Sequence, residues 1–461
     1  MSEAVRITIK DISLFERDTK LRMPFRFGIV TLREAPQLFA KVTVEDAQGR
    51  QAQGMSAEVL APKWFDKNPD LTNEDNFEQL RQSVYRARAL YTGKPAMTPF
   101  ALFADHYTAQ MDVDPDQRLN ASFGQAVLDR AVLDAVCRLE NVSFYTAIRE
   151  NIVGMSAHDI IPELQTDEIA AFLAGLSPAT SVAARHTVGL VDPLSENPDP
   201  VGDGLPETLV QVVNTYGHQY YKIKVGGNTE QDIARLIEVA EILEKHRPDY
   251  LVSLDGNEQY PDADAFLDLF ERMQGTEELS TFVDRILFIE QPIARSTALS
   301  KNISAISASR PVIIDESDSA LDVFPSAIEL GYAGVSSKSC KGFYKSLINL
   351  LRCRKAGAGY FMSAEDLTMQ AGIGVQQDLA LVSLLGLTHV ERNGHHYVNG
   401  LNDVARAEQL QFLEAHPDLY HDQDGAVRLR IENGALDISS LDCPGFASRV
   451  LPDVTTMRPV G

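Results

Sequence analysis

The chain has 461 residues, of which 44% are hydrophobic and 23% charged, the proportions of an ordinary globular protein. Its formal net charge of -23 argues against nucleic acid or an anionic membrane surface as a partner. Four scattered cysteines are too few for a disulfide framework or a zinc site. No signal peptide and no stretch of transmembrane length is apparent, so we expect a cytoplasmic protein.

The N-terminal third predicts an α+β domain over residues 1–165. Apolar and polar residues alternate over residues 5–15, 38–46 and 51–58, a pattern typical of an antiparallel meander. The segment Leu21–Gly28, between the first two strands, is too irregular for a strand and is rich in aromatic and basic groups. Apolar residues at helical spacing follow, and they predict the helices of this domain.

From residue 181 onward, apolar runs that end on a charged residue recur every 23 to 35 residues. Each interval has room for one strand and one helix, the unit of a parallel α/β fold. Charged groups at the ends of successive strands converge on one point only if the sheet closes into a barrel. We therefore expect a barrel over residues 166–399 and a tail over 400–461. The charged residues at the ends of the runs are Lys224, Asp255, Glu290, Asp315 and Lys338.

Three acids, Asp255, Glu290 and Asp315, are expected to face one cavity at the mouth of this barrel. Close carboxylates repel one another and raise each other's pKa unless a cation lies between them. Oxygen ligands of this kind suit Mg²⁺, with Mn²⁺ possible. The alternative is that the acids form ion pairs with the lysines of the barrel mouth.

Lysines are expected on two opposite sides of this site. Lys222 and Lys224 are two residues apart and point to one face of a strand, whereas Lys338 enters from across the barrel. A neighbouring cation lowers the pKa of a lysine, so Lys222 would prepare Lys224 to act as a base. Two such lysines could remove a proton from one face of a carbon and return one to the other.

The combined motifs resemble those of the enolase superfamily, within it the mandelate racemase/muconate lactonizing enzyme family, and its muconate-lactonizing-like branch. The resemblance covers nearly the whole chain. It implies a modified TIM barrel, (β/α)7β, with an N-terminal α+β capping domain that the C-terminal tail rejoins. The motifs that carry it are Lys222-Ile223-Lys224, Asp255-Gly256-Asn257, Glu290-Gln291-Pro292, Asp315-Glu316-Ser317 and Lys338-Ser339-Cys340-Lys341.

The resemblance also implies roles for single residues. Asp255, Glu290 and Asp315 would be the metal ligands. Lys224 and Lys338 would be the acid and base, with Lys222 holding the substrate carboxylate. Substrate contacts or supporting roles are expected for Asn257, Glu316, Lys341, Glu365, Glu391, Phe25 and Arg26. By contrast, His395 and His396 are expected in a loop, at the surface or in hydrogen bonds, rather than as metal ligands.

The implied reaction is metal-dependent removal of a proton α to a carboxylate, through an enediolate, in a small carboxylic acid. A racemase, epimerase or cycloisomerase is expected: a lysine on each side favours racemisation or epimerisation, whereas one working lysine would suit lactonisation or elimination. The absence of a seventh-strand histidine counts against the mandelate-racemase and sugar-acid-dehydratase branches, and the absence of paired aspartates on the last strand counts against a dipeptide epimerase. An acid dehydratase or lyase, or a metal-dependent carboxylate-binding protein without turnover, stays open. The resemblance also implies a homo-oligomer.

Overall fold

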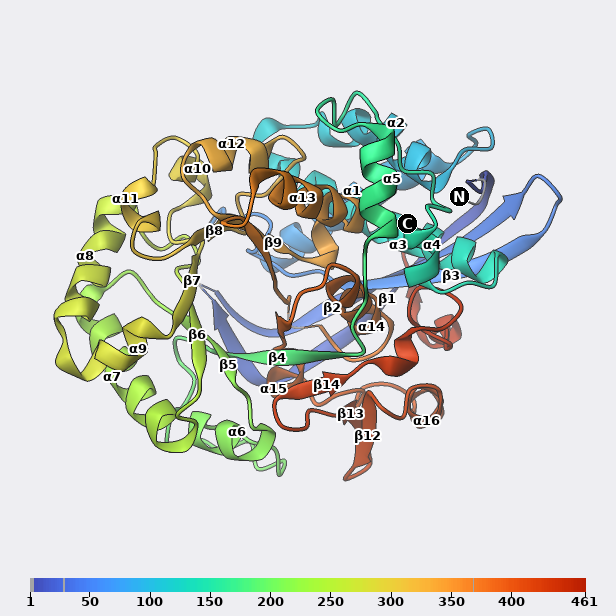
Figure 1. Cartoon of the computed structure of the whole chain (residues 1–461). Helices are drawn as coiled ribbons and strands as arrows, with labels where there is room; N and C mark the ends of the chain where they lie inside the picture. Colours follow the sequence, from blue (N-terminus) through green and yellow to red (C-terminus); the bar gives the residue numbers. More distant parts are fainter. Residues whose placement is uncertain (1–3, 28–29, 368) are drawn as a thin grey trace.

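The computed structural model describes residues 4–27, 30–367 and 369–461. It confirms the predicted fold class. Eight parallel strands, β4 to β11, lie side by side in chain order, and β11 pairs with β4 to close a barrel. Figure 1 shows these strands inside an arc of helices. The strands are β4 (Ser181–Val188), β5 (Tyr220–Lys224), β6 (Leu251–Asp255), β7 (Ile286–Glu290), β8 (Val312–Ile314), β9 (Gly334–Ser337), β10 (Phe361–Ala364) and β11 (His389–Glu391).

Helices fill each of the seven connections between these strands, as (β/α)7β requires. Most of them bury an apolar stripe against the sheet, as α8 does with Phe266, Leu269, Phe270 and Met273. The connecting helices are α6 (Leu209–Tyr216), α7 (Thr229–His246), α8 (Ala263–Gly275), α9 (Ser280–Asp284), α10 (Arg295–Ala298), α11 (Ser304–Ser307), α12 (Val323–Glu329), α13 (Phe343–Ala356) and α14 (Ile373–Leu384).

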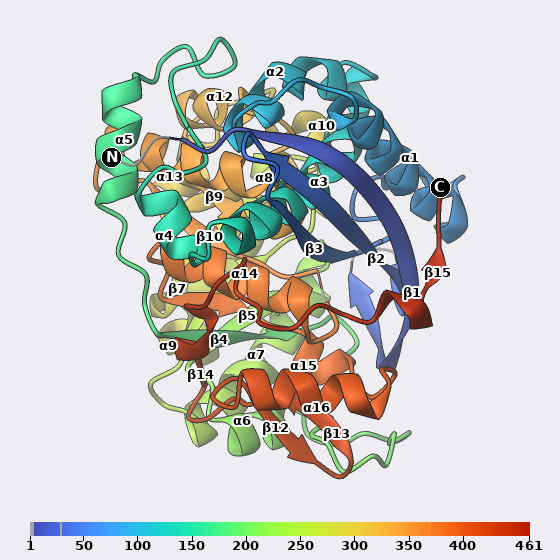
Figure 2. The same cartoon turned by 90° about the vertical axis from the view of Figure 1, so that its right-hand side faces the viewer.

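The N-terminal segment forms a cap in which helices cover one antiparallel sheet (Figure 2). Gly54 allows β3 (Gln51–Val59) to pack closely on α3 (Arg118–Leu139), because a Cβ at this position would lie 2.1 Å from the backbone nitrogen of Ala135 in that helix. The elements are β1 (Ile7–Phe27), β2 (Val30–Asp46), β3 (Gln51–Val59), α1 (Asn73–Tyr91), α2 (Pro99–Met111), α3 (Arg118–Leu139), α4 (Phe144–Arg149) and α5 (Thr166–Ala174).

One expectation about the cap is wrong. The irregular segment from Leu21 continues β1 as far as Phe27, paired with β2, and Gly28 lies outside the described residues. The register of the pair shifts between Lys20 and Phe25. A shift of this kind absorbs the residues that break the alternating pattern while the strand continues beyond them.

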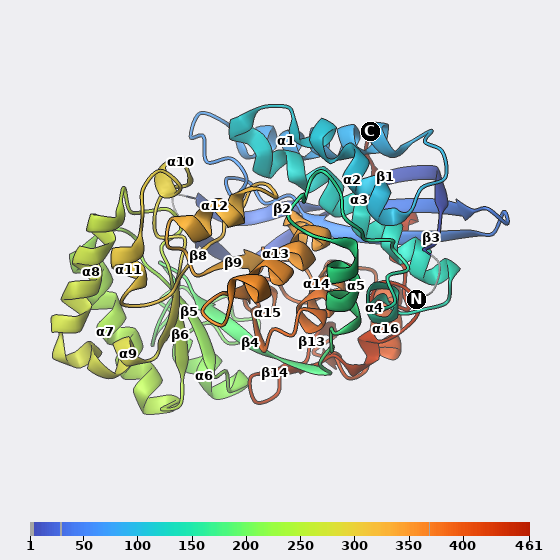
Figure 3. The same cartoon turned by 45° about the horizontal axis from the view of Figure 1, so that its top comes forward.

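The tail returns to both parts of the molecule. In it, β14 pairs with β4 of the barrel, and β15 pairs with β1 of the cap. One apolar core cluster contains residues of the cap, the barrel and the tail. Figure 3 shows α1, α2 and α3 on one side of the cap strands and the barrel on the other. The tail elements are α15 (Gly394–Tyr397), α16 (Arg406–Ala415), β12 (Tyr420–Gln423), β13 (Ala426–Leu429), β14 (Ala435–Asp437) and β15 (Arg458–Pro459).

Short 3-10 turns connect several of these elements. They are η1 (Pro115–Gln117), η2 (Glu277–Leu279), η3 (Ser339–Lys341), η4 (Ser439–Leu441) and η5 (Val454–Thr456). No helix in the described part of the chain is long and apolar enough to cross a lipid bilayer.

Candidate active site at the barrel mouth

Lys222 lies at the centre of a buried cluster of acids in the barrel. It alternates along β5 with Ile223, which the wall of the barrel buries, so Lys222 and Lys224 share the inner face. The Nζ atom of Lys222 lies 2.8 to 3.0 Å from one oxygen of each of four carboxylates. These belong to Asp255, Glu290, Glu365 and Glu391.

Lys224 and Lys338 hold two different acids of the predicted metal site. The Nζ atom of Lys224 lies 2.5 Å from Oδ2 of Asp255, and that of Lys338 lies 2.7 Å from Oδ2 of Asp315. Lys341 contacts the other oxygen of Asp315 at 3.3 Å. The structure therefore contains the ion pairs that were the alternative to a metal site, and it brings the lysines and acids together at one mouth.

Lys222 and Lys338 have raised pKa values. Burial disfavours the ammonium of Lys222, but the surrounding carboxylates outweigh it, and its pKa is raised well above the usual value. Burial also disfavours the ammonium of Lys338, but the negative charge of Asp315 outweighs burial and raises the pKa of Lys338. For these two lysines the surrounding acids outweigh both burial and the neighbouring cations, whereas the lowered pKa expected of Lys224 stays a prediction.

The three predicted metal ligands still form a donor set that suits a hard divalent cation. Burial, followed by the charges of Asp255 and Glu365, raises the pKa of Glu290 well above its usual value, and Asp315 adds to this. Among the described residues, Oε2 of Glu290 is buried without a hydrogen-bond partner. A buried carboxylate oxygen near two further acids is what a cation would satisfy.

Two further acids connect the cluster to neighbouring strands. Arg185 of β4 donates through NH2 to Glu365, and Thr187 donates to Glu391 at 2.5 Å. Arg185 and Glu365 are both fully buried. Both glutamates were predicted, but Arg185 was not, although a charged residue inside a predicted buried strand was the available signal.

The cap closes over the mouth. Phe25 of β1 and Trp64 after β3 line a cavity of about 30 Å³ together with the three lysines. Arg26, in contrast, is exposed, because adjacent residues of a strand point to opposite sides. Trp64, the only tryptophan of the chain, and Lys67 were both missed.

A loop of the cap is tied to the barrel at the same place. Lys67 donates to the backbone oxygen of Asn257 at 2.9 Å and approaches Glu316 at 3.9 Å. The side-chain amide of Asn257 donates to Glu316 at 3.3 Å. Asn257 and Glu316, both predicted supporting residues, are therefore buried beneath a cap residue, and each follows a predicted metal ligand within two positions of the chain.

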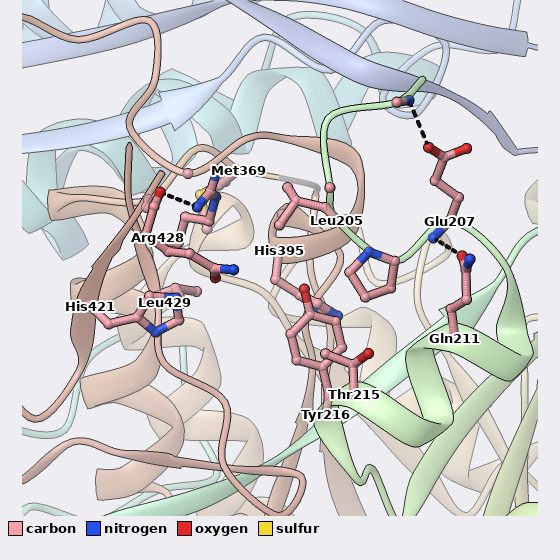
Figure 4. A pocket seen from close by; sticks show the side chains of 17 residues that line it. Leu205, Glu207, Gln211, Thr215, Tyr216, Met369, His395, His421, Arg428 and Leu429 are labelled. Carbon is pink, nitrogen blue, oxygen red and sulfur yellow. Dashed lines mark hydrogen bonds between the residues drawn. The ribbon is translucent and has the colours of Figure 1, made fainter. Parts of the chain in front are cut away.

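His395 and His396 do not lie at the surface. His395 and His396 belong to α15 and are buried, and no nitrogen of the His395 ring has a hydrogen-bond partner in the described chain. His395 also lines a second, larger cavity of about 410 Å³, formed by α6 and the tail (Figure 4). The sequence could not show this, because the residues that cover the histidines come from distant segments.

Comparison with known proteins agrees with this architecture. The family model described as enolase C-terminal domain-like matches residues 205–447, just over half of the chain. The chain therefore belongs to the enolase superfamily, in its mandelate racemase/muconate lactonizing enzyme family. No match was found among curated proteins.

Solved structures similar to this chain show the same fold over nearly its whole length. An enolase-superfamily member from Listeria innocua has a TM-score of 0.63 at 16% identity, covering 99% of this chain and 98% of its own. The 2-chloromuconate cycloisomerase of Rhodococcus opacus 1CP has 0.62 at 15%, covering 95% and 96%. A member from Roseovarius nubinhibens ISM, solved in complex with magnesium, has 0.58 at 15%, covering 99% of both chains.

Proposed function

We propose that this protein is a divalent-metal-dependent enzyme that removes a proton α to a carboxylate, most simply a racemase, epimerase or cycloisomerase of a small carboxylic acid. One observation carries the proposal: Lys224 and Lys338 hold separate acids from opposite parts of the barrel, next to one cavity. Family membership supports the metal dependence, and the magnesium in the Roseovarius relative is consistent with it.

Asp255, Glu290 and Asp315 would hold the metal ion. When bound, Mg²⁺ would stabilise the charge that develops on the substrate carboxylate and would offset the negative charge around the lysines. Lys222, between four carboxylates, keeps its charge and would orient the substrate carboxylate. Lys224 and Lys338 would exchange protons with the α-carbon from its two faces, and Trp64 and Phe25 would exclude water.

A carboxylate-binding protein without turnover is the second candidate. It is favoured by the ion pairs that hold Lys222 and Lys338 and by the raised pKa of both ammonium groups. A lysine that stays protonated binds a carboxylate but removes no proton.

Proton NMR in heavy water, with Mg²⁺ present, separates the two candidates. We would incubate the protein with acylamino acids, sugar acids, muconates and dipeptides and follow the α-proton signal. Its replacement by deuterium is expected for at least one class, and Lys338→Met should abolish it. Lys355→Met, which removes an exposed lysine paired with Glu168, should not change it. Ligand binding with no exchange in any class would overturn the enzymatic proposal.

A further inference from the structure

Four histidines from distant parts of the chain meet behind the barrel wall. His186 lies on β4, His218 just before β5, and His395 and His396 on α15. Arg185 and Thr187 point into the barrel, where they contact Glu365 and Glu391, so His186 between them points outward. The cluster therefore lies on the opposite side of β4 from the acids of the barrel mouth.

Three of these rings bring possible ligand atoms close together. One nitrogen of each of His186, His218 and His395 lies within 4.8 Å of the others. The ring centroids are 5.3 to 5.5 Å apart. Zinc–nitrogen bonds of about 2.0–2.1 Å put the nitrogens of a tetrahedral site roughly 3.4 Å apart. Small side-chain rotations would close that difference.

The unpartnered nitrogens are the second observation. His218 donates from Nδ1 to the backbone oxygen of Ala184 at 3.0 Å, so its Nε2 carries the lone pair. Among the described residues, four ring nitrogens of the cluster are buried without a hydrogen-bond partner. They are Nε2 of His218, Nδ1 of His186 and both nitrogens of His395. The backbone of Arg392 lies beside His395 but makes no hydrogen bond of normal geometry with it.

Buried polar atoms are costly unless they are satisfied, and several in one cluster point to a missing partner. The hydrogen bond from His218 to a carbonyl also has the form that orients histidine ligands in metal sites. Burial lowers the pKa of His218 to about 4 and that of His395 well below its usual value, so both rings are neutral near pH 7. Neutral imidazole is the form that binds a metal.

We propose that His186, His218 and His395 bind a borderline transition-metal ion of the Zn²⁺ class, at a site separate from the barrel mouth. Imidazole ligands favour such ions over Mg²⁺. His395 lines the 410 Å³ cavity and packs against Tyr216 with ring centroids 5.0 Å apart (Figure 4), so the fourth ligand position opens toward that cavity.

The charges around the cluster indicate the nature of the fourth ligand. The positive charge of Arg392 repels further positive charge at His395, and that of Arg247 does the same at His218. A divalent ion there needs a negative ligand to offset its charge. We therefore expect hydroxide or a small anion from the cavity as the fourth ligand.

Cobalt(II) is the probe, because its visible absorption becomes intense when four ligands surround it tetrahedrally. We would titrate Co²⁺ into the full chain in excess Mg²⁺, and into Asp255→Asn, which alters the mouth. One tetrahedral Co²⁺ per chain is expected in both. His218→Gln and His395→Gln should each weaken it at least about tenfold. His421→Gln, which removes another histidine lining the same cavity, should leave it unchanged.

Electron paramagnetic resonance of the unaltered protein with Cu²⁺ is the second measurement, since it does not depend on the folding of a variant. Coupling to several imidazole nitrogens is expected. Octahedral Co²⁺ alone, Co²⁺ lost in Asp255→Asn, or a copper signal without nitrogen coupling would overturn the proposal. The cobalt and copper spectra require no turnover, so their outcome does not depend on whether the proposed enzymatic function is correct.

Discussion

The Nζ atom of Lys338 lies 4.3 Å from the centroid of the Trp64 ring, so a side chain of the cap covers a lysine of the barrel. An aromatic face attracts an ammonium group, and the attraction is worth up to about 2 kcal/mol where water is excluded. Trp64 lies between β3 and α1, and its backbone oxygen accepts from Arg295 of the barrel at 2.8 Å. The cap therefore helps to position a proposed catalytic group as well as covering it.

Trp64→Leu should slow α-proton exchange, because the replacement removes the ring over Lys338 and opens the cavity to water. We expect a loss of roughly ten- to thirtyfold in kcat/KM, the kinetic equivalent of about 1.4–2 kcal/mol. The measurement is deuterium incorporation by NMR. Trp64→Phe retains an aromatic face and should recover part of the rate, whereas equal rates for the two variants would contradict a role for the ring.

Glu290→Gln should weaken Mg²⁺ binding at least about tenfold, because it removes the charge from the one predicted ligand that has a buried, unpartnered oxygen. Isothermal titration calorimetry of the metal-free protein measures this directly. Glu329→Gln, at the end of α12 and outside the site, is the matched control. Unchanged affinity in Glu290→Gln would remove this residue from the metal site.

Arg185→Met should destabilise the fold by about 3–5 kcal/mol, because it leaves Glu365 with less compensation for its buried charge. Denaturant unfolding measures the loss. Combining Arg185→Met with Glu365→Gln should restore part of it, since the unpaired carboxylate is then absent. A double variant less stable than either single one would argue against this explanation.

The cap contains a carboxyl group that should make stability depend on pH. Burial raises the pKa of Asp129 to about 8, although Tyr91 donates to it at 2.6 Å. The folded chain therefore keeps a proton that the unfolded chain releases above pH 4. The resulting stabilisation is present in acid and is lost as the pH rises from about 4 to 8, by up to about 1.4 kcal/mol per unit.

Asp129→Asn imitates the protonated group and should remove this contribution. Between pH 5 and 8 the free energy of unfolding of the parent should fall relative to that of the variant. Above pH 8 the difference between the two should stay constant. Urea unfolding across this range is the measurement. A difference that does not change with pH would show that Asp129 is ionised in the folded chain.

The sequence was sufficient to predict the barrel and to place the charged residues at its mouth. Parallel strands place their last residues at one edge, so the positions of Asp255, Glu290, Asp315 and Lys338 in the pattern also predict their positions in space. The roles assigned to them stay predictions. The electrostatic balance could not be predicted, because the pKa of Lys222 depends on Glu365 and Glu391, which follow it by 143 and 169 residues.

The cap and the histidine cluster were harder to predict for a related reason. Whether β1 stops or continues depends on its pairing with β2, which tolerates the register shift before Phe25. His186, His218 and His395 are far apart in sequence and have no common spacing. Only the tertiary fold brings them together.

The pairing of β15 with β1 has a consequence for how the protein is made. Arg458 of β15 lies opposite Glu16 of β1 and donates to it at 2.7 Å across 442 positions of the chain. During synthesis on a ribosome, β1 is made long before its neighbour, and the whole barrel must emerge in between. The backbone of β1 at Phe15 and Glu16 lacks this strand partner for that time, so this part of the sheet edge is a place where a chaperone, or another nascent chain, would bind.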